Sequence, residues 1–281
     1  MDAVLFKSEN IAVRACLNFG SRSAVPARRP IFLRTLLRRW FGGAKEPLPA
    51  APDPLSGDYS GEPAAEADVL LTTVPAPPRF AVAWRRHLNL LSQTSKDPAD
   101  LLLVGDSLAE WWPEHMFEDR SVLNFGLAGD HTQHLLWRLL QIPDGGLKTR
   151  CALLMIGVNN LGSGDSAEAI GAGVARVAQT LARKSTAARI LILEIPPMGT
   201  DFSFRAAERL RANESLRTLG FPTLNVDGAL TGGAPGPSPN YAEDGIHFSE
   251  AGYALLTNVL RDALLKDVGA PQPVRASGGA I

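Results

Sequence analysis

Four short segments of this sequence carry the side chains that serine-dependent acyl transfer requires. They are GDSL at residues 105–108, NFGLAGD at 124–130, GVNN at 157–160 and DGIH at 244–247. Such chemistry needs a nucleophile, a base that takes its proton, an acid that orients the base, and hydrogen-bond donors for the oxyanion. Residue types suited to each part stand in these segments.

Each part of this chemistry has a candidate residue. Ser107 is the candidate nucleophile, and His247 is the candidate base because the ordinary pKa of histidine is close to neutral pH. Asp244 precedes His247 by three residues, so it can reach the second ring nitrogen within one turn. The backbone N–H groups of Ser107 and Gly129 and the side-chain amide of Asn159 are candidate oxyanion donors.

Structural roles are the alternative for the same residues. Ser107 could serve only as a helix N-cap, and Gly129 could serve only a turn with positive φ. Asp227 is a weaker candidate for the acid, since it is distant in sequence from His247.

The motifs of other enzyme classes are missing from the sequence. The G-x-S-x-G elbow of α/β-hydrolases is absent from the chain. The first predicted strand is not followed by G-x-G-x-x-G, and there is no P-loop lysine motif.

The elements that must position these residues alternate between strands and helices. Short apolar runs predict strands at 101–105, 121–126, 151–157, 188–195 and 222–228. Amphipathic stretches predict helices near 80–96, 108–117, 131–141, 166–184, 203–219 and 250–265. This alternation predicts an α/β fold with a doubly wound parallel sheet and helices on both faces. Ligands of such sheets bind beyond the carboxyl ends of the strands, where the first three segments fall.

In order and spacing, the four segments resemble the four sequence blocks of the SGNH (GDSL) hydrolase superfamily. The resemblance covers about residues 100–265. It implies a flavodoxin-like three-layer α/β/α fold with a five-stranded parallel sheet. It also implies a catalytic triad of Ser107, Asp244 and His247. The implied oxyanion hole is formed by Ser107, Gly129 and Asn159, and no metal or organic cofactor is implied.

One position departs from the commonest form of the superfamily. Many members carry Asp after the oxyanion Asn, whereas this chain has Asn160. That form, together with GDHTQ at 129–133, is similar to the branch of platelet-activating factor acetylhydrolase catalytic subunits, which favours small acyl groups such as acetyl. We predict that the substrate pocket is lined by Trp111, Trp112, Asn160 and His131. Core packing of the tryptophans and a surface position for His131 are the alternatives.

We therefore expect a serine esterase that hydrolyses small acyl esters, above all O-acetyl esters, of a carbohydrate or lipid through an acyl-enzyme. One alternative is an O-acyltransferase that passes the same acyl group to a hydroxyl of an exopolysaccharide. Another is a non-catalytic domain recruited to a membrane or an assembly. Nucleic acid is not an expected partner, because the formal net charge of −1 gives no electrostatic footprint for it.

The chain divides by composition into four parts. Residues 1–44 are predicted to be a basic leader, in which Ile31–Phe41 forms a short amphipathic helix suited to an anionic membrane surface or a protein partner. Packing of this helix on its own domain and a transit peptide are the alternatives. Residues 45–66 are a predicted Pro/Ala-rich linker, 67–267 the hydrolase domain and 268–281 a disordered tail.

The cysteine and hydropathy patterns indicate the compartment. Cys16 and Cys151 stand in unrelated contexts, so they form neither a disulfide framework nor a metal-binding spacing. No apolar run approaches the roughly 20 residues that span a bilayer, and charged residues interrupt the first part of the chain, where a signal peptide needs an apolar core. We expect a cytoplasmic protein that becomes peripheral to a membrane where its leader helix binds one.

Overall fold

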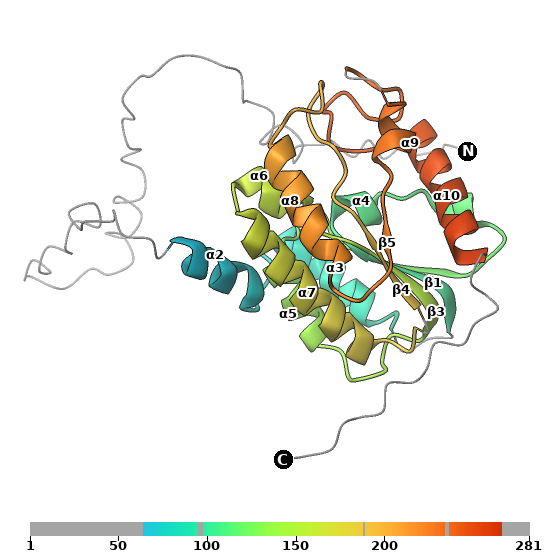
Figure 1. Ribbon diagram of the computed structural model, residues 1–281. Helices are drawn as coiled ribbons and strands as arrows, with labels where there is room; N and C mark the ends of the chain where they lie inside the picture. The colour runs from blue at the N-terminus through green and yellow to red at the C-terminus, as the bar shows by residue number, and fades with distance from the viewer. Residues whose placement is uncertain (1–63, 95–97, 188, 234–235, 266–281) are drawn as a thin grey trace, which may run out of the picture. The chain divides into compact units, whose positions relative to one another are not determined.

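A single parallel sheet forms the centre of the fold (Figure 1). The computed structural model describes residues 64–94, 98–187, 189–233 and 236–265. Its five strands lie in the order β2-β1-β3-β4-β5. They are β1 (Ala99–Gly105), β2 (Val122–Gly126), β3 (Thr149–Met155), β4 (Arg189–Leu193) and β5 (Thr223–Leu224). The predicted α/β fold class with a five-stranded parallel sheet is confirmed.

The central strands are buried on both faces. Every residue of β1 from Leu101 to Val104 is at most 1 % exposed, and β3 and β4 end in similarly buried apolar runs. The sequence of a strand that is covered on both faces is a continuous apolar run and not an alternation of apolar and polar residues. These segments are therefore easy to recognise in the sequence. The carboxyl ends of β1, β2 and β3 are in register, with Gly105 beside both Gly126 and Met155.

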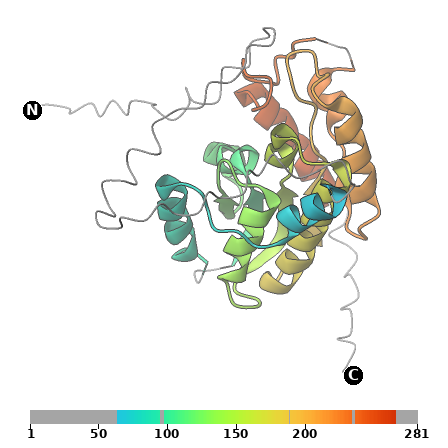
Figure 2. The same cartoon turned by 90° about the vertical axis from the view of Figure 1, so that its left-hand side faces the viewer.

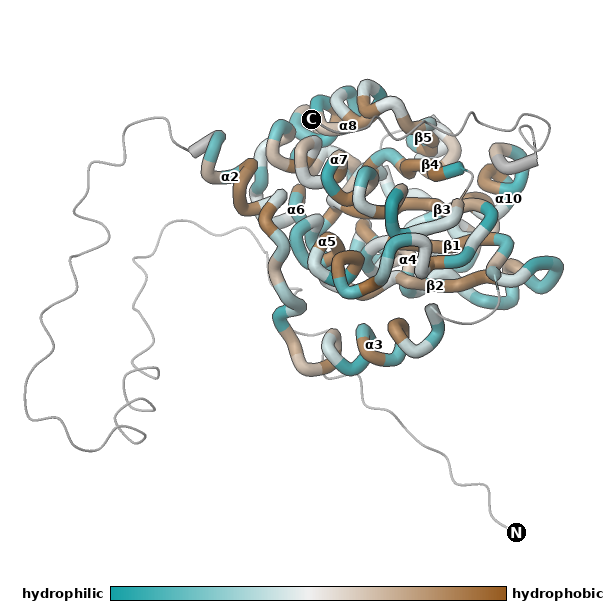
Figure 3. The backbone as a smooth tube through the Cα atoms, turned by 90° about the horizontal axis from the view of Figure 1, so that it is seen from below, coloured by the Kyte–Doolittle hydropathy of each residue, from teal (hydrophilic) through white to brown (hydrophobic). Residues whose placement is uncertain are grey.

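Helices cover the two faces of the sheet, as Figures 1 and 3 show. On one face lie α5 (Thr132–Leu140), α7 (Ala167–Lys184) and α8 (Ala206–Arg217). On the other lie α10 (Glu250–Leu265), the short α4 (Ser107–Glu110) and a 3-10 turn at Glu114–Phe117. Two further short helices, α6 (Val158–Ser163) and α9 (Asp227–Thr231), follow β3 and β5.

The predicted helix near 108–117 is wrong in its extent. The structure has α4 ending at Glu110, and only a 3-10 turn from Glu114 to Phe117. Pro113 lies between them in an extended conformation. Proline has no N–H for the helical ladder and disfavours helical geometry at the residue before it, so the helix cannot continue through this position.

Helix α2 (Ala64–Thr73) was not predicted. Its solvent side carries apolar residues, with Leu70 and Leu71 exposed, while the polar Thr72 is buried. The apolar residues therefore do not mark the packed side, and the periodicity that reveals an amphipathic helix is missing. The helix also begins inside the predicted linker 45–66.

Helices α2 and α3 (Ala81–Leu91), with the segment 74–80 between them, form the N-terminal arm. In Figure 2 the arm runs across the helices of one face. Thr72 accepts a hydrogen bond from the Thr132 hydroxyl at 2.9 Å and donates its own hydroxyl to Ala169 at 2.7 Å. The rings of Trp84 and Trp137 lie edge to face, 5.0 Å apart. The arm is thus attached to α5 and α7 by specific contacts.

Several predicted features lie outside the described residues. They are the leader 1–44 with its helix at Ile31–Phe41, nearly all of the linker, and the tail 268–281. The extent of the hydrolase domain, 67–267, stays a prediction. Within the part of the chain that the structure describes, no helix is long and apolar enough to cross a membrane.

Candidate active site

The sequence segments meet at the carboxyl end of the sheet. Ser107 begins α4 directly after β1, the loop with Gly129 follows β2, and Asn159 lies in α6 after β3. Asp244 and His247 come from the loop that precedes α10. Because the strands are parallel and in register, their ends converge on one edge, and the α10 loop completes the cluster.

Ser107, His247 and Asp244 form one hydrogen-bonded chain. The Ser107 Oγ lies 2.9 Å from His247 Nε2, and His247 Nδ1 lies 2.6 Å from Asp244 Oδ2. Ser107 is only 5 % exposed, whereas the His247 and Asp244 side chains are partly open to solvent. This is the order of contacts in a nucleophile, base and orienting acid.

A tight turn holds the acid against the base. Asp244 Oδ1 accepts the backbone N–H groups of both Ile246 and His247 at 2.9 Å, which leaves Oδ2 for the imidazole. Gly245 adopts φ +65°, and a Cβ there would lie 2.8 Å from the Gly199 carbonyl carbon. Partial burial raises the pKa of Asp244, but hydrogen bonds from His247 and Ile246 outweigh burial and hold this pKa below its usual range.

Three N–H donors surround the same edge. In the described structure, neither the Ser107 N–H nor the Gly129 N–H donates to a protein acceptor. Gly129 has φ +81° and open space where a Cβ would lie. The Asn159 amide donates one N–H to the Asp130 carbonyl at 2.9 Å, and a primary amide has a second. The three are available to a developing oxyanion.

The sequence of this site belongs to a known protein family. The model of the GDSL-like lipase/acylhydrolase family matches residues 91–255, more than half of the chain. The chain belongs to this family. It is accordingly an ester-hydrolysing enzyme.

Curated relatives and solved structures agree with the family. The Pongo abelii platelet-activating factor acetylhydrolase IB subunit alpha1 is 29 % identical over 191 residues, 64 % of this chain and 81 % of that protein. The Homo sapiens alpha2 subunit is 27 % identical over 196 residues, 65 % and 84 % of the two chains. A Bacteroides fragilis structure described as an acylhydrolase shares the fold, with a TM-score of 0.54, 15 % identity, and 67 % and 99 % of the chains covered.

Arg138, which sequence reasoning missed, holds the loop of this GDSL hydrolase that contains Gly129. Its guanidinium is fully buried and donates to the Asp130 carboxylate at 2.7 Å. It also donates to the carbonyls of Phe125 at 3.1 Å and Gly105 at 3.2 Å. One side chain thus joins both ends of the Gly129 loop to the strand end before Ser107. The available signal was a charged residue inside the apolar helix LLWRLL.

The N-terminal arm reaches the same loop through Glu110, also missed from the sequence. Glu110 accepts the Ala128 N–H and lies 3.3 Å from Arg86 of α3. Arg79 of the arm donates to His134 Nε2 at 3.3 Å, and His134 Nδ1 accepts the His131 N–H at 3.1 Å. These pairings join residues that are distant in sequence, so no local sequence pattern predicts them.

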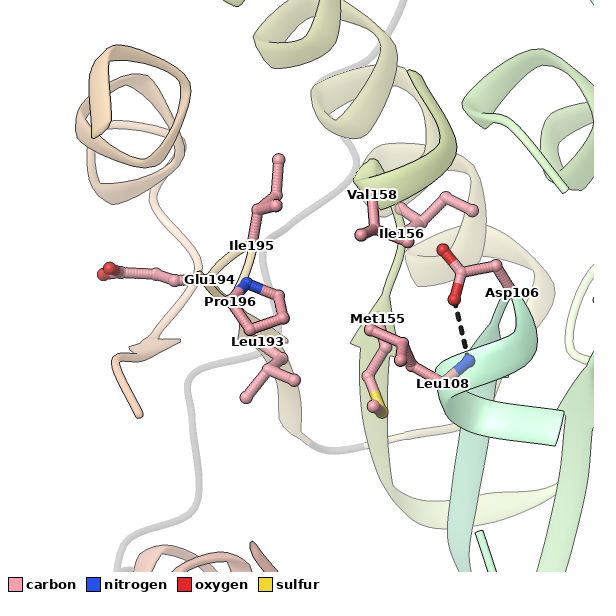
Figure 4. Close-up of a pocket in the computed structure, with 9 residues that line it drawn as sticks. All are labelled: Asp106, Leu108, Met155, Ile156, Val158, Leu193, Glu194, Ile195 and Pro196. Atoms are coloured by element: carbon pink, nitrogen blue, oxygen red, sulfur yellow. Dashed lines mark hydrogen bonds between the residues drawn. The ribbon is translucent and has the colours of Figure 1, made fainter. Parts of the chain in front are cut away.

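Asp106 carries a buried carboxyl group beside the proposed nucleophile. Its Oδ1 accepts the Leu108 N–H at 3.0 Å, whereas Oδ2 is buried without a partner among the described residues. Figure 4 shows this second oxygen directed toward Ile156 and Val158. Burial raises the pKa of Asp106 to about 8, with a further contribution from the Asp130 carboxylate. The adjoining cavity, about 10 Å³, is the size of one water and too small for an acyl group.

The predicted pocket residues separate into two groups. Trp111 is 47 % exposed, and its ring lies 4.2 Å from that of His247, so it borders the site. Trp112 is 3 % exposed, donates to Thr257 and packs on Tyr253 in the core. Trp112 therefore lies in the interior and not on a pocket wall, as the core alternative expected.

Asn160 and His131 also differ from the pocket prediction. Asn160 is fully buried; its Oδ1 accepts the Thr132 N–H and its amide donates to Asp165. It fixes the start of α5 instead of facing a substrate. His131 is 7 % exposed, with its ring nitrogens 3.2 Å from the Gly129 carbonyl and 2.8 Å from the Ser163 hydroxyl. Burial lowers the pKa of His131, and the ring supports the Gly129 loop.

Asp227 and the possible metal ligands can also be located in the structure. Asp227, the weaker candidate for the acid, pairs with Arg209 at 2.8 Å. Across the described ranges, no group of three or more His, Cys, Asp or Glu side chains is arranged to hold a metal ion.

Proposed function

We propose that this GDSL hydrolase is a serine esterase that cleaves small acyl esters, above all O-acetyl esters, of a carbohydrate or lipid. One observation carries the proposal: the continuous contact from Ser107 Oγ through the His247 ring to the Asp244 carboxylate. That chain supplies a nucleophile whose proton has a direct route to a base.

The proposed reaction passes through an acyl-enzyme. Ser107 Oγ attacks the ester carbonyl as His247 Nε2 takes the hydroxyl proton, and Asp244 stabilises the imidazolium through Nδ1. The oxyanion accepts from the Ser107 and Gly129 N–H groups and from Asn159. Collapse expels the alcohol, which takes the proton from His247. Water then attacks the acyl-enzyme by the same steps and frees the acid and Ser107.

The acyl group is proposed to be small on two grounds. The match to this chain covers 81 % and 84 % of the length of two relatives, and both carry the name acetylhydrolase. In addition, the Trp111 ring lies 4.2 Å from the His247 ring and offers an apolar surface beside the base, against which a short acyl group can pack.

Serine labelling and chain-length dependence test the proposal together. A fluorophosphonate probe is expected to label the full-length protein at Ser107, and the Ser107→Ala variant is expected to lose labelling and at least about a thousandfold in kcat. Ser92→Ala is the matched control, because Ser92 is exposed and, among the described residues, its hydroxyl donates only to the Asn89 carbonyl of its own turn. Turnover of p-nitrophenyl esters is expected to be fastest for acetate.

Three outcomes contradict the proposal in whole or in part. Labelling of another serine, or unchanged turnover by Ser107→Ala, removes Ser107 from the mechanism. A rate that increases with acyl chain length leaves the serine mechanism intact and rejects the small acyl group.

We also propose a cytoplasmic location with peripheral membrane contact through residues 31–41. The support is the sequence pattern alone, in which apolar residues and arginines occupy separate helical sides. Cell fractionation of the full-length chain tests it. Recovery in a secreted fraction, or membrane recovery unchanged by Leu36→Glu, contradicts the proposal.

A further inference from the structure

The side of α3 that faces solvent carries large apolar side chains, where a surface helix ordinarily carries polar ones. Val82 and Leu88 are 64 % and 58 % exposed, and Phe80, which directly precedes the helix, is 67 % exposed. Trp84, in the same helix, is 39 % exposed. These four side chains are the α3 patch. The other exposed positions of the helix are Ala81, Arg85 and Asn89.

Exposed apolar side chains are concentrated in this short stretch of the chain. Eleven large hydrophobic side chains are exposed among the described residues, and four of them fall within residues 80–88. Single exposed apolar side chains are normal, whereas a cluster marks a contact surface. Ala83, His87 and Leu90 bury the opposite side of α3 against the fold, so the patch cannot turn inward without breaking this packing.

The charge around the patch favours an anionic partner. Residues 69–95 contain no Asp or Glu but three arginines, Arg79, Arg85 and Arg86. Arg86 is paired with Glu110. Arg79 and Arg85 are exposed, and Arg85 forms no ion pair with any residue that the structure describes.

We propose that the α3 patch and Arg85 bind an anionic lipid surface, with α3 lying in the plane of the interface. The apolar side chains enter the boundary between headgroups and acyl chains, and Arg85 pairs with lipid phosphates. Tryptophan and phenylalanine suit this boundary, and the long arginine side chain can extend to the headgroups. Figure 3 shows α3 at the periphery of the fold with hydrophobic segments along it. The α3 patch does not include residues 31–41, and the proposal does not rest on the esterase mechanism.

Vesicle co-sedimentation of the full-length protein tests this proposal. Binding is expected to phosphatidylcholine vesicles that contain about one-third phosphatidylglycerol, and to be weaker without the anionic lipid. The variant Phe80→Ser/Val82→Ser/Leu88→Ser is expected to lower the partition coefficient at least about tenfold. Leu210→Ser on α8 is the matched control, because Leu210 is 50 % exposed elsewhere on the surface. Arg85→Glu is expected to weaken binding to anionic vesicles, by less at high salt.

The outcomes separate the lipid surface from other occupants. Circular dichroism melting curves check that each variant is folded, whether or not the protein hydrolyses a test ester. Unchanged vesicle binding by the triple variant overturns the proposal, since another part of the chain then binds lipid. Failure of the wild-type protein to bind anionic vesicles overturns it as well. So does a wild-type dimer, seen by light scattering, that the triple variant loses while vesicle binding stays unchanged.

Discussion

The imidazole of His247 is held by one contact on each ring nitrogen, and these two contacts fix its tautomer. Asp244 accepts at Nδ1, so the proton resides there and Nε2 presents a lone pair to Ser107. The same carboxylate accepts two backbone N–H groups of its own turn. Orientation of the base is therefore built into four consecutive residues, 244–247.

Asp244→Asn tests that orientation. The asparagine amide retains the shape of the carboxylate but can place a donor where Nδ1–H needs an acceptor, so the imidazole takes the other tautomer and Nε2 loses its lone pair. We expect kcat for p-nitrophenyl acetate to fall roughly a thousandfold or more with a much smaller change in KM. Asp144→Asn, a surface carboxylate paired with Lys184, is the control. Wild-type kcat in Asp244→Asn removes this residue from the proposed triad.

The residue types and spacings were enough to predict which side chains come together at this site. Ser107, Asp244 and His247 could be selected because acyl transfer needs their chemistry, and that requirement does not depend on packing. The pocket prediction fared worse for Trp112 and Asn160. Adjacent tryptophans look alike in sequence, and only the direction of the α4 turn sends one to the core and the other to the site.

At the scale of elements, the distance between α4 and the Gly129 loop is set by Arg138 of α5. Its three hydrogen bonds reach Asp130, Phe125 and Gly105. The two proposed backbone donors of the oxyanion hole therefore belong to segments that share one guanidinium. A preorganised donor pair stabilises an oxyanion only if its spacing is kept.

Arg138→Lys is expected to reduce kcat about tenfold or more while KM changes little. An ammonium can still pair with Asp130, but it lacks the planar fork that reaches the two carbonyls as well. Steady-state kinetics and thermal melting are measured together. The control is Arg211→Lys, because Arg211 is exposed and its one ion pair among the described residues is with Glu208 of the same helix. A lower melting temperature with unchanged kcat contradicts a positioning role.

Element boundaries were predictable wherever an apolar run is buried on both faces, as in β1 and β3. Element boundaries were not predictable where tertiary contacts override the local sequence pattern. Helix α2 places Leu70 and Leu71 outward, so its hydropathy does not mark its packed side. Pro113 ends α4 early although the flanking residues favour a helix.

At the scale of the whole molecule, the buried carboxyl of Asp106 links global stability to pH. Burial raises its folded-state pKa to about 8, above the ordinary value of 3.8. Between these two values the folded state holds a proton that the unfolded state has released. Stability must then decrease as pH rises through this window, by at most about 1.4 kcal/mol per pH unit from this group.

Asp106→Asn is expected to remove that dependence. The neutral amide preserves the acceptor for the Leu108 N–H and has no charge to bury. Relative to wild type, the variant should gain stability as pH rises from about 4 to about 8 and level off above it. Urea unfolding at several pH values measures the difference. A stability difference that stays constant over this range shows that Asp106 does not titrate on unfolding.

The contacts of the N-terminal arm bear on where the working enzyme begins. Arg86 supports Glu110, Arg79 supports His134, and Ala76 donates its N–H to Gln133, all at or beside the loop that carries Gly129. The family match starts only at residue 91, after Ala76, Arg79 and Arg86. The part of this chain that supports the Gly129 loop therefore begins before the residues matched by the family model. A chimera that joins the family domain to a relative's N-terminal segment would inherit the catalytic serine without the supports of its neighbouring loop.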